Sequence, residues 1–444
     1  MSFPNDFIWG AATSAYQIEG EEGRGPSIWD EFCKVAGVAS VGRACDHYNR
    51  FAEDIRLMRD IGLRAYRFSV SWPRVLPNGR GTVNRTGLDF YDRLVDELLA
   101  AGIVPWVTLF HWDYPLALHR CGGWYNRDSA AWFADYVALV VDMLSDRVSF
   151  WFTLNEPNVY VACGYRQGIH APGERLSADH AFTICHNLLR GNGMAVQAIR
   201  DRAKMQPWIG YALAPNPVPL PATDTPEDRE AARRMLFTHE EHDFMSCTWW
   251  TDPVAWGRYP EEGVRKGAAR IPDINAHDMA LIAQPIDFIG LNIYFGVPCC
   301  LADDGTVRTL PLSDAHRRTG FGWPVTPACV YWGVRFFVER YGLPVVISEN
   351  GAAYPDTVSD DGTVHDSERI EYLKEHLQWL HRACEERLPV RGYFLWSLLD
   401  NFEWAAGYTQ RFGIVYVDFH TRHRTPKDSA WWYREVITSS GTCL

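Results

Sequence analysis

The sequence predicts an α/β fold in which eight strand and helix units close into one parallel (β/α)8, or TIM, barrel. Short apolar runs alternate with stretches of helical period along the whole chain, which is typical of repeated βα units. Polar side chains stand at the ends of these runs, where barrels carry their functional groups. The chain has 444 residues, and such barrels can exceed about 400 residues when their loops are extended. We therefore expect residues 1–444 to form a single domain with extended loops after the strands.

The first half of the chain supplies five of the expected strands. The first unit covers residues 7–20, and the later strands are residues 65–70, 103–109, 149–154 and 208–213. Helical period joins them at residues 50–61, 87–101, 130–144 and 178–199. In the first of these helices Phe51, Ile55 and Met58 share one side, and Gly62 follows as a helix stop. The last strand runs into a proline-rich segment, residues 215–221, which we expect to be a stiff loop that cannot pair.

The second half supplies three more strands and two long insertions. The strands are expected at residues 286–291, 343–348 and 390–395, and the helices at residues 331–341, 367–386 and 426–437. Residues 297–326 have little periodicity and predict a loop, in which Asp303, Asp304 and Gly305 form a hairpin-like turn. Residues 352–365 and 400–413 are expected as further loops, the last of them beside the functional site.

One histidine-rich segment raises the question of a metal site. Residues 238–242 read Thr-His-Glu-Glu-His, which is not the His-Glu-x-x-His spacing of zinc hydrolases. An amphipathic helix with a solvated polar face explains this segment better. We expect neither a metal nor a cofactor.

Two of the expected strands end in a glutamate. Asn155 and Glu156 close one strand before Pro157, and Glu349 closes another before Asn350. Two carboxyl groups about 5–5.5 Å apart suit retaining glycoside hydrolysis, and a wider spacing suits inversion. The alternative is structural, because a lone strand-end glutamate commonly pairs with an arginine or caps a helix.

Four segments of the chain are similar to motifs of family 1 glycoside hydrolases, the β-glucosidase family. Residues 153–157 (Thr-Leu-Asn-Glu-Pro) and 347–351 (Ile-Ser-Glu-Asn-Gly) resemble its acid/base and nucleophile motifs. Residues 7–20 resemble its N-terminal signature, and residues 400–404 (Asp-Asn-Phe-Glu-Trp) resemble its glycone-binding segment. Ser348 stands where the family usually has threonine, but the hydroxyl group is retained.

The resemblance implies a role for each of the polar strand-end residues. Glu349 would be the nucleophile and Glu156 the acid and base, titrating as a coupled pair with a bell-shaped pH profile. Arg67 would lie beside Glu349 and keep it ionised; the alternative is an arginine that pairs elsewhere. The residues that the resemblance implies for substrate binding are Gln17, His111, Trp112, Asn155, Asn292, Tyr294, Trp323, Trp396, Glu403, Trp404 and Phe412. For Trp323 two roles stay open, stacking on the leaving group and ordinary packing.

The resemblance also implies a free sugar as substrate. Glu403 can accept hydrogen bonds from two hydroxyl groups, whereas its carboxylate would repel a 6-phosphate. We expect hydrolysis of β-glucosides and cello-oligosaccharides, with β-fucosides and β-galactosides as further substrates, and hence a part in cellulose and polysaccharide degradation. Three alternatives are a transglycosylase, a 6-phospho-β-glycosidase and a sugar-binding protein without catalysis.

Composition limits the other partners and the location. The net charge is −12 and no run of Lys or Arg forms a basic stripe, so nucleic acid is not an expected partner. Neither a secretory signal nor an apolar segment of about 18 residues is evident. The 11 cysteines are scattered and odd in number, which favours reduced thiols and a cytoplasmic location. The oligomeric state, the natural aglycone and glucose tolerance are left open.

Overall fold

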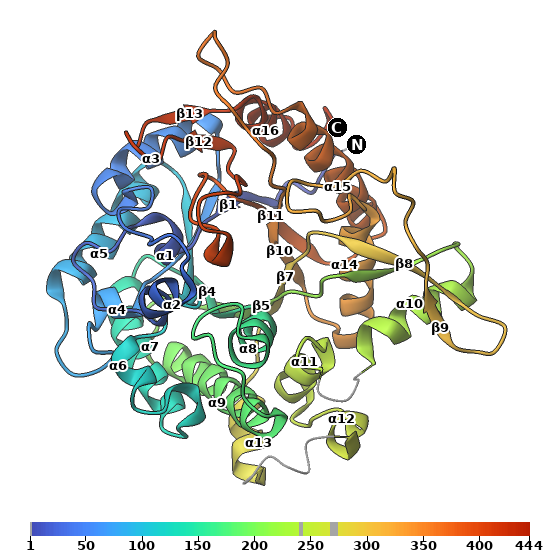
Figure 1. Ribbon diagram of the computed structural model, residues 1–444, viewed down its shortest axis with the longest axis horizontal. Helices are drawn as coiled ribbons and strands as arrows, with labels where there is room; N and C mark the ends of the chain where they lie inside the picture. The colour runs from blue at the N-terminus through green and yellow to red at the C-terminus, as the bar shows by residue number, and fades with distance from the viewer. Residues whose placement is uncertain (1, 239–242, 267–273) are drawn as a thin grey trace.

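The computed structural model describes residues 2–238, 243–266 and 274–444. Eight parallel strands close into a barrel in the order β1-β11-β10-β7-β5-β4-β3-β2, and helices surround it (Figure 1). The predicted (β/α)8 fold is thus confirmed. The barrel strands are β1 (Ile8–Ala12), β2 (Ala65–Ser69), β3 (Val104–Phe110), β4 (Phe150–Asn155), β5 (Trp208–Leu213), β7 (Phe288–Asn292), β10 (Val345–Asn350) and β11 (Val390–Trp396).

The long helices lie close to where helical period places them. They are α3 (His47–Ile61), α5 (Arg85–Ala100), α7 (Ser129–Leu144), α9 (Ala178–Arg202), α14 (Ala328–Tyr341), α15 (Ser367–Glu385) and α16 (Asp428–Thr438). Gly62 ends α3 with a φ of 79°, a left-handed conformation that glycine adopts without steric cost. Further α-helices are α1 (Ala15–Ile18), α2 (Ile28–Ala36), α4 (Trp72–Val75), α6 (Leu116–His119), α8 (Pro157–Val161), α10 (Pro226–Phe237), α11 (Cys247–Trp256), α12 (Glu261–Lys266) and α13 (Ala276–Ile282).

Aromatic side chains fill the inside of the barrel. Trp106 stacks on Phe150 with ring centroids 4.3 Å apart, and it meets Phe152, Phe288 and Phe394 edge-on or tilted. Trp106, Phe152, Phe288 and Phe394 are fully buried, so the barrel interior is a packed core rather than a pore. This core supports the strand ends that carry the polar residues.

The proline-rich segment after β5 corrects one prediction. We expected residues 215–221 to form a loop that cannot pair, but β6 (Val218–Pro221) pairs in parallel with β8 (Gly296–Leu301). The prediction was wrong because the prolines alternate along an edge strand. The N–H groups of Val218 and Ala222 face the neighbouring strand and donate to the carbonyls of Phe295 and Cys299, while Pro219 and Pro221 occupy alternate positions that need no donor.

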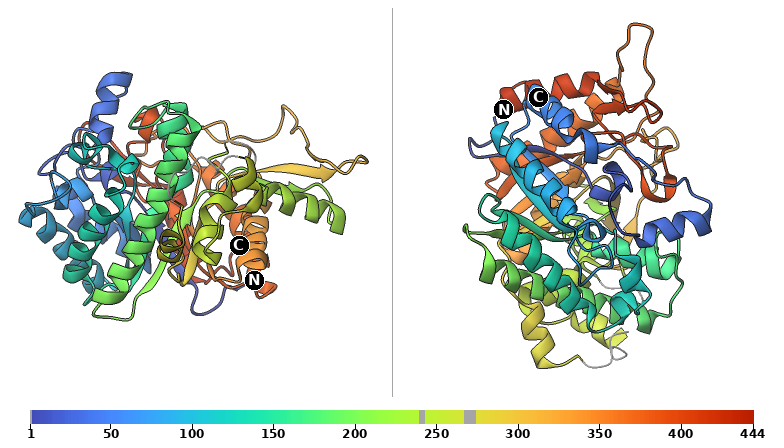
Figure 2. Two further views of the ribbon diagram at one scale, coloured as in Figure 1. Left: turned by 90° about the horizontal axis from the view of Figure 1, so that it is seen from below. Right: turned by 90° about the vertical axis from the view of Figure 1, so that its left-hand side faces the viewer.

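The insertion after β7 was also only partly predicted. Residues 297–326 were expected to be a loop, but they begin within β8, which forms a hairpin with β9 (Val307–Thr309). The expected turn is confirmed, because the N–H of Ala302 donates to the carbonyl of Thr306 across it. This hairpin projects from the side of the barrel in both Figure 1 and Figure 2. Near the C-terminus, β12 (Val415–Val417) and β13 (Arg424–Pro426) form a second small hairpin.

Three further observations concern thiols, metals and membranes. All 11 cysteines are free thiols in the structure. Within the described ranges, no group of three or more His, Cys, Asp or Glu side chains is arranged to hold a metal ion; the histidines and glutamates of residues 239–242 lie outside those ranges. Among the helices of the described part, none combines the length and the apolar character needed to cross a membrane.

Candidate functional site

A cavity of about 630 Å³ lies at the carboxyl ends of the barrel strands. Its lining includes residues at or within two positions of the ends of β3, β4, β5, β7, β10 and β11. Ten residues singled out from the sequence line it: His111, Trp112, Glu156, Tyr294, Trp323, Glu349, Trp396, Glu403, Trp404 and Phe412. The barrel therefore brings together side chains that are up to about 300 residues apart in sequence.

Glu156 reaches the cavity through an unusual backbone conformation. It follows β4 directly and has φ 44° and ψ 56°, a left-handed conformation that is uncommon for a residue other than glycine. Its N–H donates to the carbonyl of Ala212 at 2.8 Å, and Pro157 then begins α8. The carboxyl group is buried and accepts a hydrogen bond from Nδ2 of Asn292 at 2.8 Å.

Glu349 lies on β10, where the strand register is irregular. The pairing of β10 shifts against both β7 and β11 near this residue. One carboxyl oxygen accepts from Nη1 of Arg67 at 2.6 Å, and the other accepts from the hydroxyl of Tyr294 at 2.7 Å. Arg67 and Tyr294 thus both lie where the resemblance expected them, and they give this carboxylate two strong donors.

The two carboxyl groups differ in how well their negative charge is stabilised. Burial and the charge of Glu349 raise the pKa of Glu156 to about 8. Burial also raises the pKa of Glu349, but the charge of Arg67 and the Tyr294 hydroxyl oppose this effect. Glu156 accepts from a single amide, whereas Glu349 accepts from a guanidinium and a phenol. When the two carboxyl groups share one proton, that proton therefore resides on Glu156. One group is then an acid while the other is an anion.

Asn155 connects the two carboxyl groups from behind the cavity. Its Oδ1 accepts from Nη2 of Arg67 at 2.6 Å and from Nδ2 of Asn292 at 3.1 Å. The Ser348 hydroxyl donates to Oδ1 of Asn292 at 2.6 Å, so the serine that replaces the usual threonine still orients this amide. Asn155, Asn292 and Arg67 are buried and do not themselves line the cavity.

His111 lines the cavity with a neutral ring. Burial and the charge of Arg67 hold the pKa of His111 well below its usual range, so the ring is neutral. Its Nε2 lies 3.0 Å from Nδ2 of Asn155 and accepts from that amide, which leaves the proton on Nδ1. Nδ1 is buried and has no partner among the described residues, as expected for a group that donates to a ligand.

Gln17 lies behind Glu403 and is not part of the cavity lining. Its Nε2 donates to Oδ1 of Asn401 at 3.0 Å and to the carbonyl of Phe402 at 2.8 Å. The same nitrogen lies 3.4 Å from Oε2 of Glu403. The amide of Gln17 therefore ties α1 to the loop after β11 and helps to position Glu403. Burial and the charge of Glu349 raise the pKa of Glu403.

Tryptophans form much of the cavity wall. Trp396 and Trp404 lie nearly parallel to the His111 ring, with centroids 5.8 and 6.0 Å from it. Trp112 and Trp404 have positive φ values of 75° and 46°, which shows that the backbone is constrained where it carries these rings. Sequence reasoning missed a second group of lining residues on loops and on the segment after Glu156, where no strand-end motif marks them: Val159, Cys163, Ile169, His170, Ala214, Asn216, Met245, Phe295, Phe321, Ala405 and Ala406.

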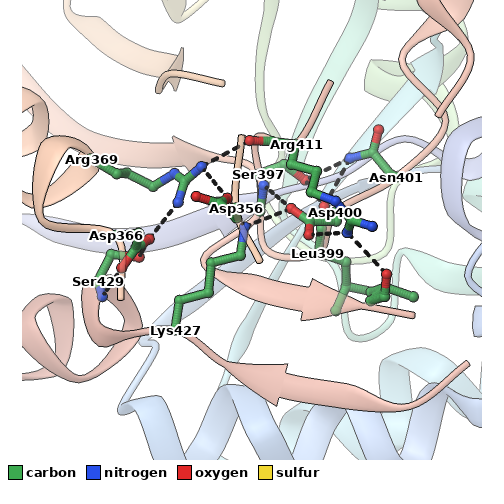
Figure 3. A network of polar contacts seen from close by, with 12 residues as sticks. Asp356, Asp366, Arg369, Ser397, Leu399, Asp400, Asn401, Arg411, Lys427 and Ser429 are labelled. Carbon is green, nitrogen blue, oxygen red and sulfur yellow. Dashed lines mark hydrogen bonds and ion pairs between the residues drawn. The ribbon is translucent and has the colours of Figure 1, made fainter. Parts of the chain in front are cut away.

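A buried ionic network supports the loop that carries Glu403 (Figure 3). Asp400 accepts from Nη1 of Arg411 at 2.6 Å, from Nζ of Lys427 at 2.8 Å and from the N–H of Gly413 at 3.0 Å. Lys427 also contacts Asp356, which pairs with Arg369 at 2.7 Å. Except for Arg411, which is partly exposed, the charged side chains named here are at least 97% buried. The network joins α15, the residue that precedes α16, and the loops that follow β10 and β11.

Replacing Lys427 by methionine is expected to destabilise the protein by about 3–5 kcal/mol, because it leaves Asp356 and Asp400 buried without their shared cation. Thermal and urea unfolding of the variant would measure the loss. The exposed Lys374 on α15 offers a matched control, since Lys374→Met removes the same charge from the surface. Equal unfolding midpoints for the two variants would contradict the role given to this network.

Comparisons with known proteins agree with the geometry. A family model described as glycosyl hydrolase family 1 matches residues 1–442. The chain is 44% identical to beta-glucosidase A of Thermotoga maritima, over 99% of this chain and 98% of that protein, and 44% identical to a 1,4-beta-D-glucan glucohydrolase of Thermotoga neapolitana, over 99% of each. A solved structure of the Thermotoga maritima beta-glucosidase in complex with deoxynojirimycin matches with a TM-score of 0.89, covering 99% of both chains.

Proposed function

The chain belongs to glycosyl hydrolase family 1, and on that premise we propose that it is a retaining β-glucosidase. The observation that carries this proposal is the pair of buried carboxyl groups in one cavity, which the surrounding charges hold in different protonation states. The names of the relatives support glucose as the glycone. We also propose that residues 1–444 act as one domain and that the enzyme works in the cytoplasm; the free thiols support that location.

In the first step Glu349 attacks the anomeric carbon of the glucosyl unit. The carbon–oxygen bond to the aglycone breaks as Glu156 gives its proton to the departing oxygen, and a glycosyl ester on Glu349 results. Arg67 and Tyr294 keep Glu349 ionised before the attack. Because both withdraw electron density from the carboxylate, they also make it a better leaving group in the second step.

In the second step water replaces the aglycone. Glu156, now ionised, takes a proton from the water molecule. The water oxygen attacks the anomeric carbon at the same time, and the ester bond to Glu349 breaks. Two displacements at one carbon restore the original β configuration. Asn292 orients Glu156 in both steps through its hydrogen bond of 2.8 Å.

The remaining polar residues recognise the glucosyl unit. Nδ1 of His111 donates to one hydroxyl and Glu403 accepts from two, while Asn155, behind the cavity, orients His111 through the hydrogen bond to its Nε2. Trp396 and Trp404 stack on the sugar, Trp112 and Phe412 complete its pocket, and Gln17 positions Glu403. A carboxylate at this place favours a free sugar over a 6-phosphate. Cello-oligosaccharides, and with them a part in cellulose degradation, belong to this proposal.

The test is the initial rate of nitrophenol release from p-nitrophenyl β-D-glucoside, compared with the 6-phosphorylated analogue. We expect turnover of the free glucoside, with the β anomer as the first product seen by NMR. Faster turnover of the 6-phosphate would support the 6-phospho-β-glycosidase alternative. Disaccharide products would support a transglycosylase, and binding of glucose without any turnover would support a sugar-binding protein.

The two carboxyl groups also predict a bell-shaped pH profile of kcat/KM. Activity falls as the pH drops through the pKa of Glu349, because the nucleophile becomes protonated, and it falls as the pH rises through the pKa of about 8 of Glu156, because the acid is lost. Tyr294→Phe removes a donor to Glu349, so the acidic limb of its profile should move to higher pH while the alkaline limb moves less. An acidic limb that stays in place would contradict the assignment of Glu349 to that limb.

A further inference from the structure

The position of Glu403 depends mainly on the backbone that carries it. Among the described residues, the one side chain that donates to its carboxyl group is Gln17, whose Nε2 lies 3.4 Å from Oε2. This distance is longer than that of an ordinary N–H···O hydrogen bond, and neither lysine nor arginine is among the residues that line the cavity. Glu349, by contrast, accepts from a guanidinium and a phenol. The loop that carries Glu403 must therefore place it.

The two ends of that loop meet at Asp400. Oδ1 of Asp400 accepts from the N–H of Gly413 at 3.0 Å, and the N–H of Asp400 donates to the carbonyl of Val415 at 2.9 Å. A Cβ atom on Gly413 would lie 2.0 Å from the Asp400 nitrogen, so the two ends are in direct backbone contact. The segment between them, residues 401–412, contributes to the cavity lining through Glu403, Trp404, Ala405, Ala406 and Phe412.

Two cations hold the carboxylate of Asp400 in place (Figure 3). Nη1 of Arg411 donates to Oδ2 at 2.6 Å, and Nζ of Lys427 donates to Oδ1 at 2.8 Å. The side chains of Asp400 and Lys427 are fully buried, and that of Arg411 is 18% exposed. Hydrogen bonds between charged groups are shorter and stronger than neutral ones. The charge of Asp400 thus fixes the base of the segment more firmly than a neutral side chain would.

The two residues that follow Asp400 transmit its position to Glu403. Oδ1 of Asn401 accepts from Nε2 of Gln17 at 3.0 Å, and the carbonyl of Phe402 accepts from the same nitrogen at 2.8 Å. Asp400, Asn401 and Phe402 are at most 2% exposed, so they are packed on all sides. A displacement of Asp400 is therefore carried along the chain to Glu403 rather than absorbed between them.

From these contacts we propose that Asp400 is a positioning residue for glycone recognition and that it determines how strongly the enzyme requires the 6-hydroxyl of the sugar. This inference rests on the proposed β-glucosidase function, in which Glu403 accepts from two hydroxyls. Since that carboxylate stands where it would repel a 6-phosphate, the 6-hydroxyl is one of the two. A hydrogen bond weakens steeply as its geometry departs from the optimum. Asp400 does not line the cavity and acts through Glu403.

The experiment compares p-nitrophenyl β-D-glucoside with p-nitrophenyl 6-deoxy-β-D-glucoside, which differ in one hydroxyl and share the leaving group. Their intrinsic reactivities are the same for every variant, so a change in the ratio of their kcat/KM values reports the contact with the 6-hydroxyl. We expect a ratio of at least about tenfold in favour of the glucoside for the wild-type enzyme. Asp400→Asn, which keeps the shape of the side chain and removes its charge, should lower this ratio by about threefold or more.

Two further single variants keep the test independent of the folding of Asp400→Asn. Arg411→Met removes one cation from Asp400 at the partly exposed edge of the network and should lower the ratio in the same direction. Asp252 supplies the matched control, because its side chain is 4% exposed, pairs with Nη2 of Arg340 at 2.7 Å and lies outside the cavity lining. Asp252→Asn should lower the unfolding midpoint and leave the ratio unchanged.

A double variant shows whether Asp400 acts through Glu403. Glu403→Ala already lacks the contact with the 6-hydroxyl, so the addition of Asp400→Asn should change the ratio no further. A residue that only stabilises the fold would lower both kcat/KM values alike and leave the ratio of the single variant at the wild-type value.

The outcomes separate this inference from the proposed function. The inference is overturned, while the β-glucosidase function stands, if the wild-type ratio is close to one or if the folded Asp400 and Arg411 variants keep the wild-type ratio. An equal fall in Asp252→Asn, or a further fall in the double variant, also overturns it. If Asp400→Asn does not fold, Arg411→Met decides. If neither glucoside is hydrolysed by the wild-type enzyme, the proposed function fails first.

Discussion

Replacing Glu349 by glutamine is expected to reduce the hydrolysis of p-nitrophenyl β-D-glucoside by on the order of 10⁴-fold or more. The amide nitrogen and oxygen are poor nucleophiles, so the glycosyl ester cannot form. The amide also removes the charge that helps to keep Glu156 protonated. Initial rates at saturating substrate, with glucose binding measured by calorimetry, would show that chemistry rather than binding is lost.

Glu19 provides a matched control for the Glu349 variant. Like Glu349, it is a buried glutamate paired with a buried arginine, with 2.7 Å between its carboxylate and Nε of Arg74, but it does not line the cavity. Glu19→Gln therefore breaks a comparable ion pair away from the reaction centre. We expect it to lower the unfolding midpoint and to preserve turnover per folded molecule. Turnover in Glu349→Gln comparable with that of Glu19→Gln would remove Glu349 from its assigned role.

Replacing Glu156 by alanine is expected to change the two chemical steps unequally. Nitrophenolate leaves without much help from an acid, so the first step retains much of its rate with p-nitrophenyl glucoside. The second step loses its base, and the steady-state rate should fall by about 10²–10⁴-fold. Stopped-flow measurement should then show a burst of nitrophenol as the glycosyl ester accumulates. With methyl β-D-glucoside, whose alkoxide needs a proton, the loss should fall on the first step and no burst should appear.

Azide gives this prediction a second readout. The azide anion attacks without the help of a base and fits the space vacated by the carboxylate. It should therefore accelerate the breakdown of the glycosyl ester on Glu349 and yield β-glucosyl azide. The wild-type enzyme, which keeps the Glu156 charge in that space, should not respond. Equal losses for aryl and alkyl substrates, without a burst or an azide effect, would show that Glu156 is not the acid and base.

Strand-end residues are the part of the site that the sequence could predict. Glu156, Glu349 and Tyr294 stand at or near the ends of apolar runs, and a closed parallel barrel must bring those ends to one face. The order of the eight units follows from the same periodicity, because consecutive parallel strands need a helix between them. The strand-end positions and the order of the units depend only on the local sequence pattern and on one rule of topology. Both can therefore be predicted from a single sequence.

Contacts between distant loops could not be predicted in this way. The place of Gln17 depends on Asn401 and Phe402, nearly 390 residues away, and no periodicity specifies that pairing. The same holds for Lys427 between Asp356 and Asp400. Lining residues that were not predicted, such as Ile169, Met245 and Phe321, lie on segments without a strand-end position, where side-chain direction depends on the packing of neighbouring loops.

The proline-bearing edge of β6 bears on how molecules of this protein meet one another. An open strand edge ordinarily offers N–H groups that a second chain can pair with, which leads to sheet extension and aggregation. Pro219 and Pro221 remove the donors from the outer side of β6, while Val218 and Ala222 keep theirs for the partner strand. The outer side of β6 therefore lacks the two donors that another strand would need at these positions, which disfavours extension of the small sheet at this edge.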